Sequence, residues 1–382
     1  MTDTIYRTFL RVRGANRAPF TLVLLDRLRR HTNVDYLAPN YTNGGAAGRI
    51  GSLGGMPLLR AAAMAETRGW QVDTMRAPSA WALGYTGGSV ALGMLDSGFE
   101  PGNPDLAFNS SYYDFTAGRA DNHCTSGSPA VCYYEDVFHG TGVLGTAVGT
   151  QNSVGAVGIA PSTIGANIAK VLYLHFAGVQ QLPVDVFSDA VKYMSDLSSD
   201  YSNHTGIAVT SLGYPSGQDS TYFPALLDAF NYGANQRNTL WFAAAGNNSP
   251  GRVVLSPASF GNVVAVGALD RANGSLVVPS YSPDNPKVEL VAPGTNVFIP
   301  WNHNDPTNPS STITTSGTSF AAPAAAAVAK MVLQRFPSYT AAQVRQHMRT
   351  YARDLGPAGK DNQFGYGMVD AYCAVQLIAP CP

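Results

Sequence analysis

Three side chains that could act together in nucleophilic catalysis stand next to predicted strands and helices. Asp96 follows the apolar stretch 90–95, His139 is followed by Gly-Thr, and Ser319 precedes an alanine-rich run. A serine hydroxyl attacks a carbonyl carbon when an imidazole accepts its proton and a carboxylate orients that imidazole. Singly, a turn aspartate or a helix-capping serine is more often structural. Together the three residue types indicate acyl transfer.

A fourth polar residue completes such a set. Asn247 follows the apolar stretch 239–245, and its amide could donate a hydrogen bond to an oxyanion; it could also simply occupy a left-handed turn position. The helix predicted after Ser319 points free N–H groups and its positive dipole end at that serine. Pro323 is expected in the first helical turn, where its missing N–H costs little.

The scaffold needed for this set is an α/β fold. Nearly continuous apolar stretches alternate with helical patterns, which predicts a doubly wound, mostly parallel sheet with helices on both faces. In such a sheet, functional sites gather at the carboxyl ends of the strands. The predicted strands are 89–95, 164–172, 206–212, 239–245, 262–267 and 288–292, and the predicted helices are 139–149, 184–197, 221–237, 318–336 and 340–353.

Composition excludes several classes of function. Charged residues make up 13% of the 382 residues and the formal net charge is −1, so no field favours nucleic acid or an anionic membrane surface. The apolar run 320–329 stops at Lys330, too short to span a bilayer. We therefore expect no nucleic-acid partner and no membrane partner; we also expect a monomer, and acyl transfer by Asp96, His139 and Ser319 would need no organic cofactor.

Cysteine spacing indicates an oxidising compartment. Cys124 and Cys132, like Cys373 and Cys381, form close pairs that suggest two local disulfides, although four cysteines permit three connectivities. The spacing is a poor zinc signature. Residues 1–14 have no apolar signal-peptide core, and because the cysteines indicate an oxidising compartment, we expect the sequence to begin after one.

The chain divides into three parts. Residues 1–41 are predicted to form a small α+β unit, 42–57 a glycine-rich linker, and 58–382 the main domain. The first unit is too short for a substantial core of its own, so it is expected to pack on the main domain.

The motifs together resemble the subtilisin-like serine protease family over roughly residues 66–376. They are VALGMLDSG at 90–98, HGTGVLG at 139–145, SLG at 211–213, AAAGN at 243–247 and SGTSFAAP at 316–323, with a family-like ending at 364–371. The last of the five is specific, whereas the aspartate motif is weak alone. Gly142 and Leu144 replace the family's usual His and Ala without removing a catalytic group.

The resemblance implies a role for each residue of the set. Ser319 attacks the scissile carbonyl, His139 takes and returns the proton, Asp96 orients His139, and Asn247 with the Ser319 N–H holds the oxyanion. It also implies that polypeptide substrates pair with the chain at Ser211, Leu212 and Gly213 and face Ala244, Ala245 and Gly246. Because Leu255 and Asn248 near this site are uncharged, we expect broad specificity without a preference for paired basic residues.

A structural calcium ion is also implied. Asp105, Asn152 and Glu66 stand at positions that resemble the family's strong calcium site, where hard oxygens surround the ion. Alternatively, the first two are an aspartate in a proline-rich turn and an asparagine in a loop. The insertion with Cys124 and Cys132 is expected to be a disulfide-closed surface loop near the cleft.

Rival functions remain open at this point. A sedolisin-like acid peptidase shares the Ser-Gly-Thr-Ser nucleophile but uses a glutamate base, and Asp96 and His139 argue against it. An α/β-hydrolase esterase requires Gly-x-Ser-x-Gly, which Ser319 lacks. An inactive protease-like binding module would keep the fold without turnover, and the presence of all four catalytic groups disfavours it.

Residues 1–41 resemble the latter part of the family's inhibitory propeptide, so we predict a secreted zymogen. The flexible linker exposes the chain to proteolysis, and we expect self-cleavage between Tyr41 and Leu59. N-terminal sequencing of active protein tests this expectation, because active material that still begins at Met1 would refute it.

Overall fold

The computed structural model describes much of the chain from Glu66 onward. The predicted N-terminal unit 1–41 and linker 42–57 lie outside the described residues, as do Cys124, Cys132 and Asn248. The described residues are 66–88, 90–99, 103, 105–106, 108–115, 134–153, 155–161, 166–170, 173–175, 179–200, 205–214, 222–247, 253–300 and 312–382.

Helices and strands alternate along the described chain. Among the described residues no helix is both long enough and apolar enough to cross a bilayer. The helices are α2 (Trp70–Thr74), α3 (Ala77–Trp81), α4 (Tyr134–Val148), α5 (Val184–Asp200), α6 (Pro224–Gln236), α7 (Thr318–Arg335), α8 (Ala341–Thr350) and α9 (Ala371–Gln376). The strands are β1 (Leu92–Asp96), β2 (Phe108–Asp114), β3 (Ala166–Lys170), β4 (Tyr173–His175), β5 (Val179–Gln181), β6 (Gly206–Thr210), β7 (Thr239–Ala244), β8 (Val263–Ala272), β9 (Ser275–Val277), β10 (Leu290–Pro293), β11 (Val297–Pro300) and β12 (Thr312–Thr315).

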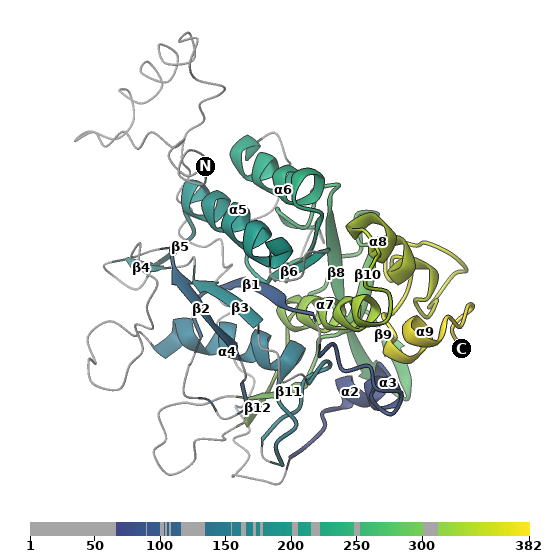
Figure 1. The fold of residues 1–382 in the computed structure, drawn as a ribbon. Coiled ribbons are helices and arrows are strands. Elements are labelled where there is room, and N and C mark those ends of the chain that lie inside the picture. Colours follow the sequence, from purple (N-terminus) through teal and green to yellow (C-terminus); the bar gives the residue numbers. More distant parts are fainter. Residues whose placement is uncertain are drawn as a thin grey trace, which may run out of the picture.

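A parallel sheet forms the centre of the molecule, as predicted (Figure 1). Its strands lie in the order β10-β8-β7-β6-β1-β3-β2, and every neighbouring pair along this path is parallel. The reversal of order around β1 is typical of a doubly wound sheet, in which sites lie beyond the carboxyl ends of the strands. Six strands match the predicted stretches, whereas the edge strand β2 was not predicted.

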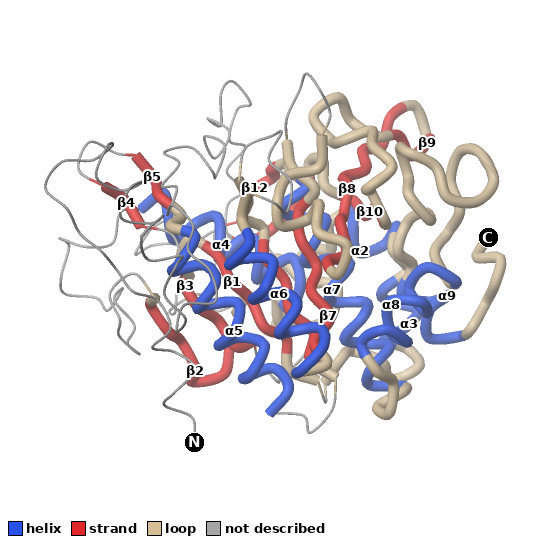
Figure 2. The backbone as a smooth tube through the Cα atoms, turned by 90° about the horizontal axis from the view of Figure 1, so that it is seen from above, coloured by secondary structure: helices blue, strands red, loops and turns tan. Residues whose placement is uncertain are grey.

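Helices cover both faces of this sheet (Figures 1 and 2). Successive strand residues point to opposite faces, so Phe242 joins the core that packs against α4 and α7, while Trp241 and Ala243 join the core against α5 and α6. The α7 side is lined by alanines that are fully buried, which lets this helix lie close to the sheet. The predicted α/β class with helices on both faces is confirmed.

Short antiparallel ribbons supplement the parallel sheet. β11 pairs with β12 immediately before α7, β9 pairs with β8, and β4 pairs with β5. The sequence interpretation included none of them, because ribbons of three or four residues have too few alternating positions to stand out. The β11–β12 ribbon matters for the site, since it leads the chain into α7.

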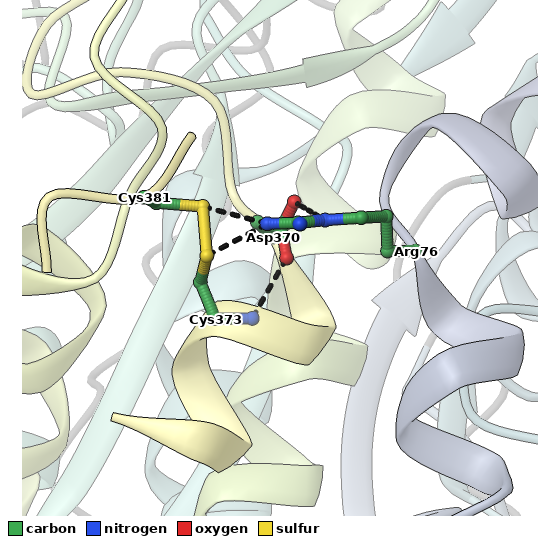
Figure 3. The surroundings of a disulfide bond; sticks show 4 residues. All are labelled: Arg76, Asp370, Cys373 and Cys381. Carbon is green, nitrogen blue, oxygen red and sulfur yellow. Dashed lines mark hydrogen bonds and ion pairs between the residues drawn. A yellow bond between two sulfur atoms is a disulfide. The ribbon is translucent and has the colours of Figure 1, made fainter. Parts of the chain in front are cut away.

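The Cys373–Cys381 disulfide is present as expected and fixes the C-terminal end of the described chain (Figure 3). Arg76 donates hydrogen bonds to both sulfurs and to Asp370 Oδ2, and Asp370 Oδ1 accepts the backbone N–H of Cys373 at the start of α9. These contacts join α9 to the segment between α2 and α3. Because the sulfurs are bonded to each other, this group is a crosslink rather than the zinc site weighed above.

Candidate active site

A buried carboxylate and an imidazole meet at the carboxyl end of β1. Asp96, the last residue of that strand, is fully buried, and its Oδ1 lies 2.7 Å from Nδ1 of His139. The backbone N–H of Ser97 donates to the same oxygen at 2.7 Å, and the Ser97 hydroxyl does so at 3.2 Å. A carboxylate oxygen in this position accepts a hydrogen bond from the imidazole and so holds it with its Nδ1 protonated. This leaves Nε2 as the ring nitrogen able to accept a proton.

The electrostatics of His139 favour a base that works at neutral or alkaline pH. Burial lowers the pKa of His139, but the charge of Asp96 and its hydrogen bond outweigh burial, so that the pKa lies above its ordinary value of 6.5. The imidazole is neutral above this raised pKa and is able to accept a proton there.

Helix α4 brings His139 to Asp96 through a close backbone contact. A Cβ atom added at Gly140 would lie 2.0 Å from the Gly98 carbonyl oxygen and 3.2 Å from Asp96 Cβ. Glycine is therefore required at this position because it lets the helix touch the turn after β1.

The placement of His139 within its helix corrects the sequence interpretation. The helix was predicted to begin at His139, but α4 begins at Tyr134, so that His139 stands in the second turn. Gly140, Gly142 and Gly145 weaken the helical pattern of the sequence, whereas in the folded protein they are the positions where α4 approaches its neighbours closely.

Ser319 lies in the first turn of α7, and its surroundings correct the reading of Pro323. The proline is the sixth residue of the helix and stands in its second turn, not the first. Proline has no N–H to donate to the carbonyl four residues earlier, which belongs to Ser319. That carbonyl instead accepts the hydroxyl of Ser211 at 2.7 Å. Because of Pro323, the Ser319 carbonyl is free of a helical partner and accepts the hydrogen bond from Ser211, which follows β6.

Asn247 contacts the same helical turn from the end of β7. Its Oδ1 accepts the N–H of Thr318 at 2.8 Å and the Thr318 hydroxyl at 2.9 Å. The hydroxyl oxygen of Thr318 accepts the N–H of Gly246 at 3.0 Å. Both hydrogen bonds are accepted by the Asn247 Oδ1, so that Nδ2 points away from Thr318. The Asn247 side chain is exposed. Its amide group is thus available to donate next to Ser319.

His139 lies near the turn that carries Ser319 but, within the described part of the chain, does not form a hydrogen bond with that residue. The His139 ring lies 6.0 Å from the ring of Phe320, the residue after Ser319. The hydrogen bonds of the described residues do not include one between His139 and Ser319. Catalytic hydrogen bonds are often long in a free enzyme and tighten when substrate binds.

The residues predicted to bind substrate lie in two segments that both contact α7. Ser211 is half-buried, whereas Leu212 and Ala245 have side chains in the hydrophobic core. Gly213 and Gly246 have no side chains, and Ala244 is also buried. Of these six residues only Ser211 has a side chain that is not buried, and its hydroxyl donates to the Ser319 carbonyl.

The replacement residues in the His139 motif have structural explanations. A Cβ atom at Gly142 would lie 2.4 Å from Ile299 Cδ1 and 3.3 Å from Phe320 Cε1. Leu144 is fully buried in the core between α4, α7 and the sheet. Ile299 of β11 thus fills the space in which the family's usual histidine side chain would lie.

The three residues predicted to hold calcium lie around one loop, residues 152–156. Asp105 Oδ1 lies 3.4 Å from Asn152 Nδ2, and Asp105 Oδ2 accepts the N–H of Ala156 at 3.0 Å. Glu66 Oε2 accepts the N–H of Ser153, in the same loop as Asn152. Burial raises the pKa of Asp105 to about 6, an effect that Ala156 and Asn152 oppose and the charge of Glu66 reinforces.

Three contributors to this site were not singled out from the sequence. Ser97 donates to the buried carboxylate, Thr318 bridges Asn247 and Gly246, and Gly140 permits the close approach of α4. Ser97 and Thr318 are hydroxyl residues next to a candidate catalytic residue, which is the signal that could have found them.

Comparison with known proteins gives consistent matches. A family described as "Subtilase family" matches residues 87–367. The chain is 32% identical over 300 residues to the minor extracellular protease Epr of Bacillus subtilis (strain 168), covering 78% of this chain and 40% of that protein. It is 31% identical over 308 residues to subtilisin Savinase of Lederbergia lenta, covering 80% of this chain and 98% of that protein.

A solved structure shares the fold. The crystal structure of fervidolysin from Fervidobacterium pennivorans, titled a keratinolytic enzyme related to subtilisin, matches with a TM-score of 0.65 and 23% identity. The match covers 81% of this chain and 46% of that one. The chain thus spans less than half the length of fervidolysin and of the Bacillus subtilis relative.

The close approach at Gly140 gives a direct test of how His139 is positioned. Replacing Gly140 with alanine forces α4 away from Gly98 and Asp96, which should destabilise the protein by about 1–3 kcal/mol. A shift of the imidazole by about 1 Å should lower any His139-dependent activity by about 10²-fold. Urea unfolding and a hydrolysis assay measure the two effects.

Gly261→Ala is the matched control, because no atom lies within 4 Å of a Cβ atom at that position. It should change stability by no more than about 0.5 kcal/mol. If both variants behaved alike, the close contact at Gly140 would not be what positions His139.

Proposed function

The chain belongs to the subtilase family, and we propose that it is a serine endopeptidase that cleaves polypeptides through Asp96, His139 and Ser319. The observation that carries the proposal is the 2.7 Å contact between buried Asp96 and His139, beside the helical turn that presents Ser319. The geometry supports a base, a residue that orients it and a nucleophile on three separate elements.

The proposed mechanism proceeds in two halves. His139 Nε2 accepts the proton of the Ser319 hydroxyl as Ser319 Oγ bonds to the scissile carbonyl carbon, and the imidazolium that forms is stabilised by Asp96. His139 then gives this proton to the leaving amine as the peptide C–N bond breaks, which leaves an acyl-enzyme. A water molecule, deprotonated by His139, releases the acyl group and restores Ser319.

The oxyanion is proposed to be held by Asn247 Nδ2 and the backbone N–H of Ser319. The hydrogen bonds of Asn247 Oδ1 to Thr318 support this, because they fix the amide with its donor directed away from Thr318. Donors that are oriented before the reaction stabilise the developing charge without reorganising. The N-terminal end of α7 adds a favourable field at the same place.

Substrate binding is proposed to use main-chain pairing along two segments. Ser211, Leu212 and Gly213 would pair with an extended polypeptide, and Ala244, Ala245 and Gly246 would flank the side chain before the scissile bond. Buried side chains at Leu212 and Ala245 support a backbone-based contact. Because backbone pairing accepts many sequences, we propose broad specificity along the bound strand.

We further propose a secreted protein made as a zymogen and holding a structural calcium ion. The Cys373–Cys381 disulfide and the name of the extracellular Bacillus protease support secretion. For calcium, the residue types fit: Asp105 and Glu66 offer carboxylates, and Asn152 offers an amide oxygen once its amide turns from the arrangement in which Nδ2 faces Asp105, all hard ligands. Burial and the charge of Glu66 act against an ionised Asp105, and a cation would relieve this repulsion. The ion would stabilise the fold and take no part in proton transfer.

A small alkyl phosphonofluoridate tests the nucleophile and its base together. We expect it to label Ser319, and to label nothing in the Ser319→Ala variant. Because the raised pKa of His139 lies above 6.5, the labelling rate should fall as the pH falls through that pKa and the imidazole becomes protonated. Mass spectrometry of the modified peptide measures the rate at each pH.

Asp96→Asn separates this mechanism from its rivals. Loss of the negative charge should move the pH limb to lower pH, and rates on the plateau should fall by about 10⁴-fold. In the unaltered protein, an acid peptidase would be labelled fastest at low pH, and an inactive binding module would not be labelled at all. Either result with the unaltered protein would overturn the proposed function.

Calcium removal tests the proposed ion separately from catalysis. Chelation should lower the thermal unfolding temperature, and excess calcium should restore it, since a ligand at 100 times its Kd stabilises by about 2.7 kcal/mol. Asp105→Asn should abolish the response, whereas Asp228→Asn, at an exposed position on α6, should keep it. A melting temperature that chelation leaves unchanged in the unaltered protein would refute the calcium site.

A further inference from the structure

Leu255 lies between the two segments proposed to bind substrate. Its backbone N–H donates to the carbonyl of Ala245 at 2.9 Å, which attaches it to the segment after β7. The next residue, Ser256, accepts the N–H of Tyr214 at 2.8 Å and pairs with it as an antiparallel bridge. The chain at Leu255 and Ser256 therefore crosses from one substrate-binding segment to the other.

The side chain of Leu255 occupies the space left by Gly246 and lies in van der Waals contact with the position of Gly213. A Cβ atom at Gly246 would lie 2.6 Å from Leu255 Cγ and 2.9 Å from its Cδ1. A Cβ atom at Gly213 would lie 3.6 Å from Leu255 Cβ. The leucine thus packs against both segments at positions where neither has a side chain. It is half-buried, so part of it remains open to solvent.

The same two segments are attached to the turn that presents Ser319. The Ser211 hydroxyl binds the Ser319 carbonyl, and the Gly246 N–H binds the Thr318 hydroxyl. In the proposed mode of substrate binding, the side chain that adjoins the attacked carbonyl lies between these segments, where Leu255 lies.

We propose that Leu255 restricts the residue whose carbonyl is attacked, called P1, to small side chains such as glycine, alanine and serine. This inference rests on the proposed endopeptidase function and narrows its broad specificity at one position. Adding bulk to a space already filled forces neighbouring atoms to shift, so a large P1 side chain would have to displace Leu255. A single excess methylene in an apolar pocket commonly changes kcat/KM by 10-fold to 200-fold.

A peptide series that differs only at P1 tests the proposal on the full chain. For the unaltered protein, kcat/KM should be at least tenfold higher with alanine at P1 than with phenylalanine. Leu255→Gly should raise the phenylalanine-to-alanine ratio by tenfold or more, and Leu255→Ala should raise it by less. The ratio for one preparation is independent of how much of the enzyme is folded, so partial misfolding of a variant does not affect it.

Leu83→Gly is the control, because the same side chain is removed from an exposed position outside the site; it should leave the ratio unchanged. Equal or faster cleavage after phenylalanine by the unaltered protein, or an unchanged ratio in Leu255→Gly, would overturn the inference. The phosphonofluoridate reaction keeps this result apart from the parent proposal, since it needs no P1 side chain. Labelling of Ser319 with fast cleavage after phenylalanine refutes the role of Leu255 alone, whereas no labelling and no cleavage refutes both.

Discussion

The hydrogen bond between Asp96 and His139 is the interaction on which the rest of the site depends. Burying an unpaired carboxylate is expensive, and Asp96 is fully buried. Its position at the end of a parallel strand supplies the Ser97 N–H, and the approach of α4 supplies the imidazole. The approach in turn requires glycine at position 140. The hydrogen bond from His139 therefore both stabilises the buried Asp96 carboxylate and orients the imidazole proposed as the base.

The proposed nucleophile, Ser319, lies in a helical turn that is held by the segments following two neighbouring strands. Ser211 follows β6 and binds the Ser319 carbonyl, and Asn247 and Gly246 follow β7 and bind Thr318. Neighbouring parallel strands end at the same edge, so their loops reach one helix N-terminus together. Pro323 contributes by leaving the Ser319 carbonyl without a partner inside the helix.

How much of this could be read from the sequence depends on the range of the interaction. The central strands and the doubly wound class follow from local apolar patterning, and the Cys373–Cys381 pair follows from spacing. The start of α4 does not, because its glycines weaken the helical pattern and are explained only by contacts with Gly98 and other distant atoms. The place of Pro323 in its helix was missed by one turn. Leu255 was placed near the site from the sequence, but only as an uncharged residue; its contacts at Gly246 and Gly213 are what suggest a steric role.

Helix α4 connects the two parts of the molecule whose functions are proposed. Its second turn carries His139, and its C-terminal carbonyls need partners outside the helix. Thr146 and Ala147 receive the N–H groups of Ile159 and Ala160, while Thr150 donates to the Asp105 carbonyl. The loop of the proposed calcium ligands is thus hydrogen-bonded at both ends to the helix that carries His139, the proposed base. An ion there would stabilise the end of α4 by favouring the loop conformation that satisfies those carbonyls, and so would support the imidazole without touching it.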